Sequence, residues 1–454
     1  MAVTAEDMTA SFDKAARTLV VGLGMTGLSV ARYLSRQGVA VAIVDSREHP
    51  PGLERLRDEL PDDVALFLGG FRPEAFARAG QIVVSPGVSR DEPEIAAALE
   101  RGVPVIGDIE LFAQVALAPV IAVTGSNGKS TVVTLINAMA QRAGRDVRMG
   151  GNIGTPALDL LADNEPDLYV LELSSFQLES VQSLRAAAAV VLNISADHLD
   201  RYPDMQAYAD AKRVIYRNAG MQVVNRDDAT AVALADPGKP VTGYSLAAPA
   251  GDDYGILDSD GEQWLARGNT PLMPVTDVCM AGRHNLANAL AALALGDAAG
   301  LPLAPMLATL REFRGLPHRM QFVAEHANVR WYNDSKGTNV GATLAAIDGT
   351  DGSLVLIAGG DGKGADFTPL AAVAGRLRAV VVLGKDAAEL TRVLAPVTQV
   401  IQATDLPQAV RLAADVAQSG DTVLLSPACA STDMFSNYME RGEVFIHAVE
   451  ALAR

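Results

Sequence analysis

The sequence is poor in several residue types, and each scarcity excludes a class of protein. It has two cysteines, Cys279 and Cys429, which are far apart and lack metal-cluster spacing, so neither a disulfide framework nor a zinc site is expected. No apolar run is long enough to span a bilayer, and residues 1–14 are acidic and Ala-rich, unlike a signal peptide. These features predict a cytoplasmic protein with no membrane partner.

Positive charge is also in deficit, because 37 Lys and Arg face 54 Asp and Glu, for a net charge of −17. Such a chain releases few counterions from a phosphate backbone, so nucleic acid is not an expected partner. An acidic protein can still bind anions locally, through glycine-rich turns and a few placed cations. We therefore expect small-molecule substrates. A monomer is expected as well.

The composition, with 49% hydrophobic and 20% charged residues over 454 positions, predicts a globular protein of two to four domains. Strand-like apolar runs alternate with helical stretches, which indicates an α/β fold with parallel sheets. Three blocks emerge, at 1–107, 108–315 and 316–454. Within the second, alternation over 254–272 around Asp260-Gly261 predicts a hairpin. The expected strands are 18–23, 41–44, 81–85, 120–124, 168–173, 188–194, 222–225, 329–333, 354–358, 379–383 and 422–425.

One glycine-rich turn follows the expected strand 120–124 and opens a helix. It aims backbone N–H groups and a helix N-terminus at one point, as a polyphosphate requires. Its Lys can reach the β- and γ-phosphates, and the Ser hydroxyl after it can coordinate Mg²⁺. The pattern is shorter than the standard P-loop, since Val occupies position 123, and an accidental loop is the alternative. The turn reads Thr124, Gly125, Ser126, Asn127, Gly128, Lys129, Ser130, Thr131.

An earlier glycine-rich turn, 22–27, follows the strand 18–23 and precedes an amphipathic helix. With Asp45 at the end of the next strand, followed by Ser46 and Arg47, it first suggests a dinucleotide-binding unit. A purely structural role, in tight strand–helix packing, is the alternative. Because the later turn already supplies an ATP-type site, we interpret this one as a pocket for the diphosphate of a nucleotide-linked substrate. The segment from Ser85 to Gly87 adds backbone near the same sheet edge.

Three side chains of the second block are candidates for chemistry. Glu172 ends the strand 168–173, where parallel sheets place ligands, and can bind Mg²⁺, although a capping or surface role is the alternative. His198 follows another strand and can be a ligand or a hydrogen-bonded structural residue. Lys212 lies inside a helix that starts near Met205, where the pattern alone predicts a solvated surface residue.

Further candidates lie later in the chain. Asn285 and Asn288 share one helix face and suit a base edge or a ribose, although Asn285 could instead cap the helix. Arg319 follows a turn, and small and charged residues fill three loops that follow strands, at 334–339, 359–363 and 426–431. We expect these loops to form one rim of a composite site. Cys429 is not expected to be a nucleophile.

Taken together, these segments resemble the Mur ligases over almost the whole chain. The motifs that carry the resemblance occur in order at 124–131, 150–154 (GGNIG), 171–179 (LELSSFQLE), 197–202 (DHLDRY), 315–319 (GLPHR), 333–336 (NDSK), 359–363 (GGDGK) and 426–431 (SPACAS). The resemblance implies three domains: an N-terminal Rossmann-like parallel sheet, a central P-loop ATPase-like α/β domain and a C-terminal Rossmann-like α/β domain. It also implies ATP-driven addition of D-glutamate to UDP-N-acetylmuramoyl-L-alanine through an acyl phosphate, in peptidoglycan precursor synthesis.

The resemblance also implies roles for single residues. It assigns the UDP-linked substrate to Met25, Thr26, Asp45, Ser46, Arg47, Asn152 and His198, and to these the segment after the strand 81–85 adds Ser85 and Gly87. It assigns ATP to Gly125 through Thr131, Asn285, Asn288, Arg319 and Asp334. It assigns catalysis to Lys129, Glu172, His198 and Lys212. Two Mg²⁺ ions are expected, with Ser130, Glu172, His198 and a carbamylated Lys212 as their ligands. Glutamate falls to Lys336, Thr338, Lys363, Ser431 and Tyr438.

The chain departs from the family pattern at three positions. Tyr438 stands where Phe is usual, Thr432 where an apolar residue is usual, and Ser46 where Thr is common. Of these three differences, the added hydroxyl of Tyr438 is the one that can change the contacts to the amino-acid substrate. Three other functions stay open at this stage: a folylpolyglutamate synthase, an NAD(P)-dependent oxidoreductase and a non-catalytic ATP-binding regulator.

Overall fold

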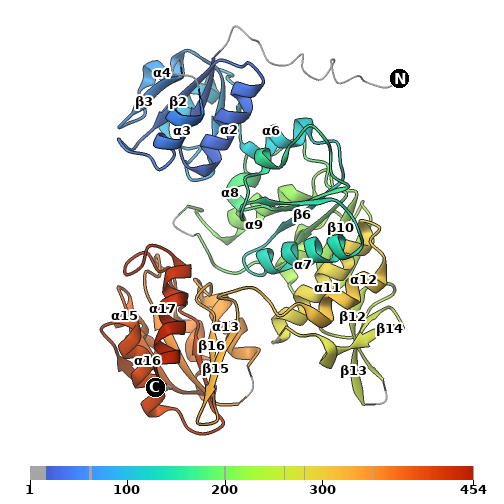
Figure 1. Ribbon diagram of the computed structural model, residues 1–454, viewed down its shortest axis with the longest axis vertical. Helices are drawn as coiled ribbons and strands as arrows, with labels where there is room; N and C mark the ends of the chain where they lie inside the picture. The colour runs from blue at the N-terminus through green and yellow to red at the C-terminus, as the bar shows by residue number, and fades with distance from the viewer. Residues whose placement is uncertain are drawn as a thin grey trace. The chain divides into compact units, whose positions relative to one another are not determined.

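The structure is a computed structural model that describes residues 17–60, 64–198, 201–259, 261–280, 282–350 and 352–452 (Figure 1). Residues 1–14, two residues of the 197–202 motif (Leu199 and Asp200) and Asp260 of the expected hairpin turn lie outside these ranges. Contacts divide the chain into two compact units, each treated by itself below. Of the described residues, those within 1–124, 144–189 and 211–222 form the first unit, and those within 125–143, 190–210 and 223–454 form the second.

The N-terminal sheet is fully parallel and has the strand order β3-β2-β1-β4-β5. Its strands are β1 (Arg17–Val21), β2 (Val41–Asp45), β3 (Ala65–Leu68), β4 (Ala79–Val84) and β5 (Val105–Ile106), and its helices are α2 (Met25–Arg36), α3 (Leu53–Glu59), α4 (Pro73–Ala77) and α5 (Pro93–Glu100). The order reverses between β1 and β4, the place where open α/β sheets bind ligands. The predicted Rossmann-like sheet is therefore present, and the expected strands 18–23, 41–44 and 81–85 match β1, β2 and β4.

The middle sheet has nine strands in the order β14-β13-β12-β11-β10-β9-β6-β8-β7. Its strands are β6 (Val120–Thr124), β7 (Val147–Gly151), β8 (Leu168–Glu172), β9 (Ala188–Val191), β10 (Met221–Asn225), β11 (Val241–Tyr244), β12 (Tyr254–Ser259), β13 (Glu262–Arg267) and β14 (Thr270–Pro274). Strands β12 and β13 pair antiparallel from Tyr254↔Arg267 to Ser259↔Glu262, which confirms the expected hairpin.

Helices flank the middle sheet. They are α6 (Asp108–Val115), α7 (Lys129–Arg142), η2 (Ala157–Leu160), α8 (Ser175–Leu178), α9 (Met205–Arg213), η3 (Val214–Tyr216), α10 (Ala229–Leu234), η4 (Val275–Asp277), α11 (Arg283–Ala298) and α12 (Leu303–Glu312). In the second unit, α7 packs against α11 and α12, as Figure 1 shows. Helix α7 therefore starts at the predicted Lys129 and is held in place along its length.

The C-terminal sheet has the order β15-β16-β20-β17-β18-β19, parallel except for the β15–β16 hairpin. Its strands are β15 (Gln321–His326), β16 (Val329–Asn333), β17 (Leu354–Gly359), β18 (Leu377–Leu383), β19 (Gln399–Gln402) and β20 (Thr422–Leu425). The helices are α13 (Val340–Asp348), α14 (Thr368–Ala371), η5 (Ala374–Arg376), α15 (Ala387–Leu394), α16 (Leu406–Val416) and α17 (Tyr438–Ala451).

This third sheet is buried on both faces, as parallel sheets require. Alternate residues of β17 enter different cores: Leu354 and Leu356 pack with α13, α14 and α15, whereas Val355 and Ile357 pack with α16 and α17. The three-domain α/β prediction therefore agrees with the observed sheets. The side chains that bear on function occupy the loops after the strands.

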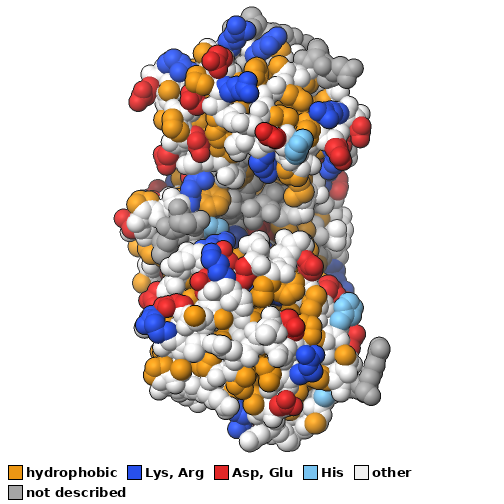
Figure 2. Space-filling model, turned by 90° about the vertical axis from the view of Figure 1, so that its left-hand side faces the viewer, with side chains coloured by type: hydrophobic (Ala, Val, Ile, Leu, Met, Phe, Trp, Pro, Cys, Tyr) orange, Lys and Arg blue, Asp and Glu red, His pale blue; other side chains and the backbone are white. Residues whose placement is uncertain are grey.

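Hydrophobic side chains that remain exposed include Leu117, Phe322 and Val397. On the face drawn in Figure 2, acidic and basic side chains are interspersed with hydrophobic ones. Among the described residues, every helix is too short or too polar to cross a membrane. Both cysteines are free thiols, Cys279 exposed and Cys429 buried.

Candidate substrate and nucleotide pockets

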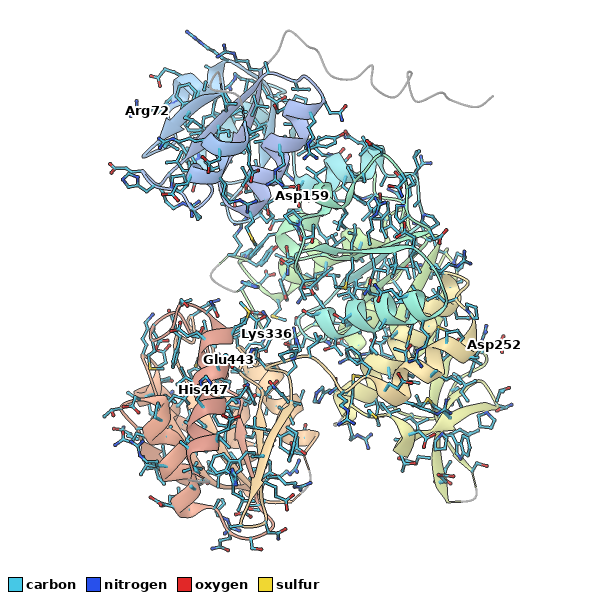
Figure 3. The ribbon with its side chains drawn as sticks, viewed as in Figure 1. Arg72, Asp159, Asp252, Lys336, Glu443 and His447 are labelled. Atoms are coloured by element: carbon cyan, nitrogen blue, oxygen red, sulfur yellow. The ribbon has the colours of Figure 1, made fainter. Side chains whose placement is uncertain are left out.

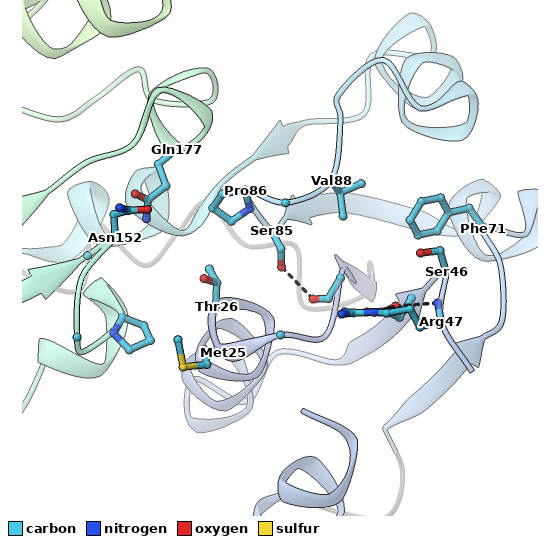
Figure 4. A pocket seen from close by; sticks show the side chains of 17 residues that line it. Met25, Thr26, Ser46, Arg47, Phe71, Ser85, Pro86, Val88, Asn152 and Gln177 are labelled. Atoms are coloured by element: carbon cyan, nitrogen blue, oxygen red, sulfur yellow. Dashed lines mark hydrogen bonds and ion pairs between the residues drawn. The ribbon is translucent and has the colours of Figure 1, made fainter. Parts of the chain in front are cut away.

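A pocket of about 570 Å³ in the first unit opens at the carboxyl ends of β1, β2 and β4 (Figure 4). It is lined by Gly22, Gly24, Met25, Thr26, Asp45, Ser46, Arg47, Phe71, Ser85, Pro86, Gly87, Val88, Gly151, Asn152, Gly154, Pro156 and Gln177. All predicted UDP-substrate residues line it except His198, which belongs to the second unit. Phe71 and Val88, which belong to no motif, were not predicted, and neither was Gln177, which lies in the 171–179 motif but was given no role.

The three glycines of the first turn have different physical roles. Gly22 has a φ of +90°, which L side chains rarely adopt, and a Cβ at Gly27 would collide with the carbonyl oxygen of Gly22. A Cβ at Gly24 would meet no atom within 4 Å. Gly22 and Gly27 therefore build the turn and the strand–helix contact, whereas Gly24 leaves open space beside the pocket. The Ser85 hydroxyl donates to the Gly22 carbonyl at 2.9 Å and holds the turn to β4.

Asp45 and Arg47 form an ion pair in this pocket. The buried Asp45 carboxylate accepts from Arg47 Nε at 2.8 Å, from Arg47 Nη2 at 2.7 Å and from the Leu23 backbone N–H at 2.7 Å. Burial alone would raise the pKa of Asp45, but hydrogen bonds from Arg47 and from the Leu23 and Arg47 backbone outweigh it and lower the pKa. The carboxylate is ionised and already paired, so the exposed side of Arg47 is what the pocket offers to an anion.

Asp159 on η2 connects two walls of this pocket within the first unit (Figure 3 labels it). Its carboxylate accepts from Ser29 Oγ at 2.9 Å and from Arg32 Nη1 at 3.2 Å, both on α2. Helix α2 follows the glycine turn, and η2 follows the 151–156 wall of the pocket. These contacts join the two walls.

Glu172 ends β8, next to β6 in the sheet, and is 3% exposed. Its Oε1 accepts from Asn152 Nδ2 at 2.8 Å, while Oε2 is buried with no hydrogen-bond partner among the described residues. A buried carboxylate oxygen without a donor fits a cation ligand. The alternative roles for Glu172, as a cap or a surface residue, are wrong.

Lys212 is buried, with 2% of its surface exposed. The solvated surface position that its pattern predicts is therefore wrong: the helix α9 turns this face inward, and Lys212 Nζ lies 3.5 Å from Thr124 Oγ1 at the end of β6. Thr124 Oγ1 in turn donates to the Leu173 carbonyl at 2.7 Å. The amine therefore lies beside the end of the strand that leads into the phosphate-type loop.

A second pocket, of about 340 Å³, lies entirely in the second unit. Seven predicted ATP residues line it: Asn127, Gly128, Thr131, Asn285, Asn288, Arg319 and Asp334. Gly125, Ser126, Lys129 and Ser130 belong to the same loop but do not line it. Its wall also contains Lys336, which was expected only at the glutamate end, and Asn193, Asp228 and His284, which sequence reasoning missed.

The loop of this pocket is held by its own glycines and by backbone hydrogen bonds. Gly125 has a φ of +145° and Gly128 a φ of +87°, and a Cβ at Gly128 would lie 2.5 Å from Asn288 Oδ1. The Asn127 N–H donates to Asn193 Oδ1 at 2.8 Å. Lys129 Nζ donates to the carbonyls of Gly125 and Ser126 at 2.8 and 2.9 Å. The lysine is therefore held over the loop that it was predicted to serve.

Two amides form one wall of this pocket. Asn288 Nδ2 donates to Asn285 Oδ1 at 3.1 Å, and both residues are buried. The N-cap of α11 is Gly282 and makes no side-chain capping bond, so the capping alternative for Asn285 is wrong. The neighbouring His284 has an Nδ1 that is buried without a partner among the described residues. Burial lowers the pKa of His284 to about 4, so the ring is neutral at pH 7.

Arg319 and Asp334 enter the second pocket from the C-terminal block. Arg319 Nη2 donates to Ser130 Oγ at 3.0 Å. Asp334 accepts from Ser426 Oγ at 2.7 Å, and burial raises the pKa of Asp334 to about 6. A cation and a carboxylate from beyond residue 315 thus line the same pocket as the glycine-rich loop.

Residues expected at the glutamate end partly come together. Lys336, labelled in Figure 3, places Nζ 3.9 Å from the centre of the Tyr438 ring, a cation–π contact. The loops at 359–363 and 426–431 meet through Asp361 and Ala430, whose backbones pair antiparallel. Lys363, which follows Asp361, is exposed, and Ser431, which follows Ala430, is buried. Thr338 N donates to the Lys336 carbonyl at 2.9 Å.

The proposed Mg²⁺ ligands come from several parts of the chain. Among the residues that the structure describes, His, Cys, Asp and Glu form no group of three or more with metal-site geometry. The predicted set depends instead on Ser130 and Lys212 as well, with Glu172 and Lys212 in the first unit and Ser130 and His198 in the second. His198 has a φ of +55° and lies with its Nε2 3.8 Å from Asp197 Oδ2.

Burial raises the pKa of Cys429 to about 12, which disfavours a nucleophilic thiolate.

Three family descriptions match consecutive parts of the chain. They are "Mur ligase MurD-like, N-terminal domain" over residues 16–107, "Mur ligase middle domain" over 123–296 and "Mur ligase, glutamate ligase domain" over 318–429. Two relatives named UDP-N-acetylmuramoylalanine–D-glutamate ligase are similar over nearly full length. The Nitrosococcus oceani protein is 56% identical (96% of this chain, 97% of that one), and the Methylobacillus flagellatus protein is 54% identical (96% and 97%).

A solved structure is similar in fold. The UDP-N-acetylmuramate–alanine ligase of Thermotoga maritima superposes with a TM-score of 0.59 and 20% identity, covering 96% of this chain and 99% of that one. At this identity the likeness concerns the fold alone.

Proposed function

Because the chain belongs to the Mur ligase family, we propose that it is an ATP-dependent ligase that joins D-glutamate to UDP-N-acetylmuramoyl-L-alanine in peptidoglycan precursor synthesis. The observation that carries this proposal is 56% identity, over 96% of the chain, to a protein that bears the corresponding name. The family matches at 16–107, 123–296 and 318–429 contain every residue that lines the two pockets.

The first pocket is the proposed site of the UDP-linked substrate. Its chemistry supports this assignment, because Gly24 leaves room for a ligand to approach and the exposed Arg47 can pair with an anion. Met25, Thr26, Ser46 and the backbone of 85–87 supply the remaining contacts. Asn152 lines the opposite wall and is the proposed contact to the sugar end.

The second pocket and its loop are the proposed site of ATP. Backbone N–H groups of 125–131 and the start of α7 suit the phosphates, with Lys129 among the β- and γ-phosphate oxygens. Asn285 and Asn288 suit the adenosine, since both amides line the pocket and can hydrogen-bond to a base edge or a ribose. Arg319 and Asp334 are proposed contacts of the phosphates and the ribose.

The proposed reaction has two steps. The alanyl carboxylate attacks the γ-phosphate, which forms an acyl phosphate and releases ADP. The amine of D-glutamate then attacks the acyl carbon, the amide bond forms, and inorganic phosphate and a proton leave. Lys129 and Arg319 neutralise charge on the transferred phosphoryl group. The position of that group relative to the alanyl carboxylate sets the rate.

Mg²⁺ is proposed at Glu172, His198 and Ser130, with a second ion at a carbamylated Lys212. The orphaned Oε2 of Glu172 supports a cation there. When bound, the ions neutralise phosphate charge and polarise the phosphorus centre. Carbamylation joins Lys212 Nζ to CO₂ with loss of a proton, and converts a buried amine into an oxygen ligand. The burial of Lys212 supports this modification.

The C-terminal loops are the proposed glutamate site. D-Glutamate carries two carboxylates, and each can pair with a cationic side chain. Lys336 and Lys363 are the cationic side chains among the five proposed contacts. Thr338 and Ser431 supply hydroxyl donors, and Tyr438 an aromatic face. The extra hydroxyl of Tyr438, where the family usually has Phe, lies on the same side chain that contacts Lys336.

The domain limits, location and oligomeric state also belong to the proposal. We place the domains at 1–107, 108–315 and 316–454; β5 ends at Ile106, α12 ends at Glu312 and β15 starts at Gln321, which supports these limits. A cytoplasmic location is supported by the two free thiols. The protein is proposed to act as a monomer.

The alternative functions fit less well. An NAD(P)-dependent oxidoreductase would use Asp45 on a ribose, but both Asp45 oxygens already accept hydrogen bonds. A folylpolyglutamate synthase has no need of the first pocket, and a non-catalytic ATP binder has no need of Lys336 and Lys363. A nicotinamide absorbance assay and a folate-dependent assay distinguish the two enzymes.

Phosphate release tests the proposal. The enzyme is given ATP, Mg²⁺ and UDP-N-acetylmuramoyl-L-alanine with D-glutamate, L-glutamate or no amino acid. Release only with D-glutamate is expected. Release only with L-glutamate keeps the mechanism and changes the substrate, whereas release with neither overturns the substrate assignment.

A further inference from the structure

Gln177 is a polar residue of the first pocket's wall whose amide orientation is set by contacts within the protein. Its Oε1 accepts from the Ser174 N–H at 3.1 Å and from Ser174 Oγ at 3.3 Å, while its Nε2 donates to Asp108 Oδ2 at 3.1 Å. Three contacts therefore fix which end is the carbonyl and which the amine. Gln177 is 3% exposed and lines the pocket, beside Asn152 in Figure 4.

Asp108 starts α6 and is 2% exposed. Its Oδ2 accepts from Gln177, and its Oδ1 is buried with no hydrogen-bond partner among the described residues. An ionised carboxylate accepts only, so it determines that the Gln177 group facing it is the amine. Without that acceptor, the amine end of Gln177 loses its partner, and only the two Ser174 contacts hold the amide.

We infer that Asp108 is a positioning residue for the sugar end of the nucleotide-linked substrate, which acts by holding the Gln177 amide so that its second N–H is available to a substrate oxygen. This inference rests on the proposed function, because it needs a substrate in the first pocket. Asp108 itself does not line the pocket, so its effect passes through Gln177.

The charge on Asp108 makes the inference testable by pH. Burial raises the pKa of Asp108 to about 6, so the carboxylate is ionised at pH 8 and protonated at pH 5. Of the helices that pack on α6, η2 carries Asp159, which is held by Ser29 and Arg32, and α8 carries no titratable side chain. On α6 itself, Glu110 accepts from the backbone of Gln182 and Ser183.

Two substitutions separate the acceptor from its charge. Asp108→Asn keeps an oxygen for Gln177 but has no charge, so it reproduces the protonated form. Asp108→Ala removes the acceptor altogether. Glu110→Gln is the matched control, since it removes a second buried carboxylate from the same helix without a contact to Gln177.

The experiment measures the Kd of UDP-N-acetylmuramoyl-L-alanine between pH 5 and pH 8, with thermal unfolding as a check on the fold. We expect Asp108→Ala to weaken binding about tenfold at pH 8, the effect of about one lost hydrogen bond to a charged group. Asp108→Asn is expected to weaken it about threefold, as a neutral acceptor replaces a charged one. The wild-type Kd rises as pH falls through about 6, whereas the Asp108→Asn Kd does not.

Three results would overturn the inference. A folded Asp108→Ala variant with the wild-type Kd would do so, as would a wild-type and an Asp108→Asn profile that run parallel, or a Glu110→Gln variant that loses as much affinity as Asp108→Ala. Should Asp108→Ala not fold, the pH comparison with Asp108→Asn decides alone. Failure of the wild type to bind the substrate overturns the proposed function as well, which separates the two failures.

Discussion

Two glycine-rich turns, 22–27 and 125–128, follow buried strands and open helices, yet their surroundings differ. In the first, Gly24 faces open space and the nearby Asp45 is paired with Arg47. In the second, Gly128 abuts Asn288, and Lys129 donates to the carbonyls of its own loop. A glycine pattern therefore fixes a backbone path, whereas the chemistry depends on which glycine is free and which charge lies beside it.

The largest expected effect separates the two turns by catalysis. Lys129→Ala should reduce phosphate release at least about a thousandfold, because the cation that neutralises the transferred group is lost. Steady-state phosphate release with both substrates measures this. Arg142→Ala, at the other end of the same helix and exposed with its partner Glu312, serves as the control. Near wild-type turnover of Lys129→Ala would remove this residue from the mechanism.

The next prediction separates the glycines of the first turn. Gly27→Ala places a Cβ against the Gly22 carbonyl and should destabilise the fold by more than about 2 kcal/mol. Gly24→Ala has free space and should cost about 1 kcal/mol or less, while it weakens binding of the UDP-linked substrate. Denaturant unfolding and a substrate titration measure the two effects. Equal destabilisation by both would show that the turn packs uniformly.

The carboxylates of the two pockets should respond to pH in opposite directions. The pKa of Asp45 is lowered, so its contribution is present at pH 7 and is lost as the pH falls through the folded-state pKa. The pKa of Asp334 is raised to about 6, so the folded state binds a proton that the unfolded state has released, and stability falls as the pH rises from about 4 to about 6.

Substitution by Asn tests these signs. Asp45→Asn should lower the free energy of unfolding at pH 7, by about 1 kcal/mol, since the exposed Arg47 is screened by solvent. The free energy of unfolding of Asp334→Asn should rise relative to that of the wild type between pH 4 and pH 7, by up to about 3 kcal/mol. Thermal unfolding without ligand across that range is the measurement. If both substitutions change the free energy of unfolding with the same sign, the pKa values of the two carboxylates are not shifted in opposite directions, and the account is contradicted.

The smallest expected effect concerns the aromatic side chain beside Lys336. Tyr438→Phe retains the ring face and should change the KM for D-glutamate by less than about threefold, whereas Tyr438→Leu removes the cation–π contact and should raise it about fivefold. Initial rates at varied D-glutamate measure both. A loss in Tyr438→Phe as large as that in Tyr438→Leu would assign the effect to the hydroxyl.

Much of the fold could be predicted from the sequence, because buried parallel strands are continuous apolar runs bounded by glycine. The strands 120–124, 329–333 and 422–425 have the predicted bounds. Short or half-buried strands could not be found in this way. β5 has two residues, β3 is only partly buried, and β15 alternates weakly at a sheet edge.

The pockets show the same limit. Residues inside motifs, such as Asp45, Asn127 and Arg319, line a pocket as expected. His284 and Asp228 also line one, but a neutral histidine and a turn aspartate carry no pattern of their own. Gln177 lies inside the 171–179 motif, but nothing in that motif marks the glutamine as a pocket residue. The burial of Lys212 could not be predicted either, since it depends on how α9 packs rather than on the spacing of its residues.

The most direct test of the account asks whether the two turns bind different substrates. ADP and UDP-N-acetylmuramoyl-L-alanine are titrated separately, by calorimetry, into Gly24→Val and Lys129→Ala. Gly24→Val should lose at least about tenfold in affinity for the UDP-linked substrate and keep its affinity for ADP, and Lys129→Ala should do the reverse. Loss of both ligands together in either folded variant would contradict the account.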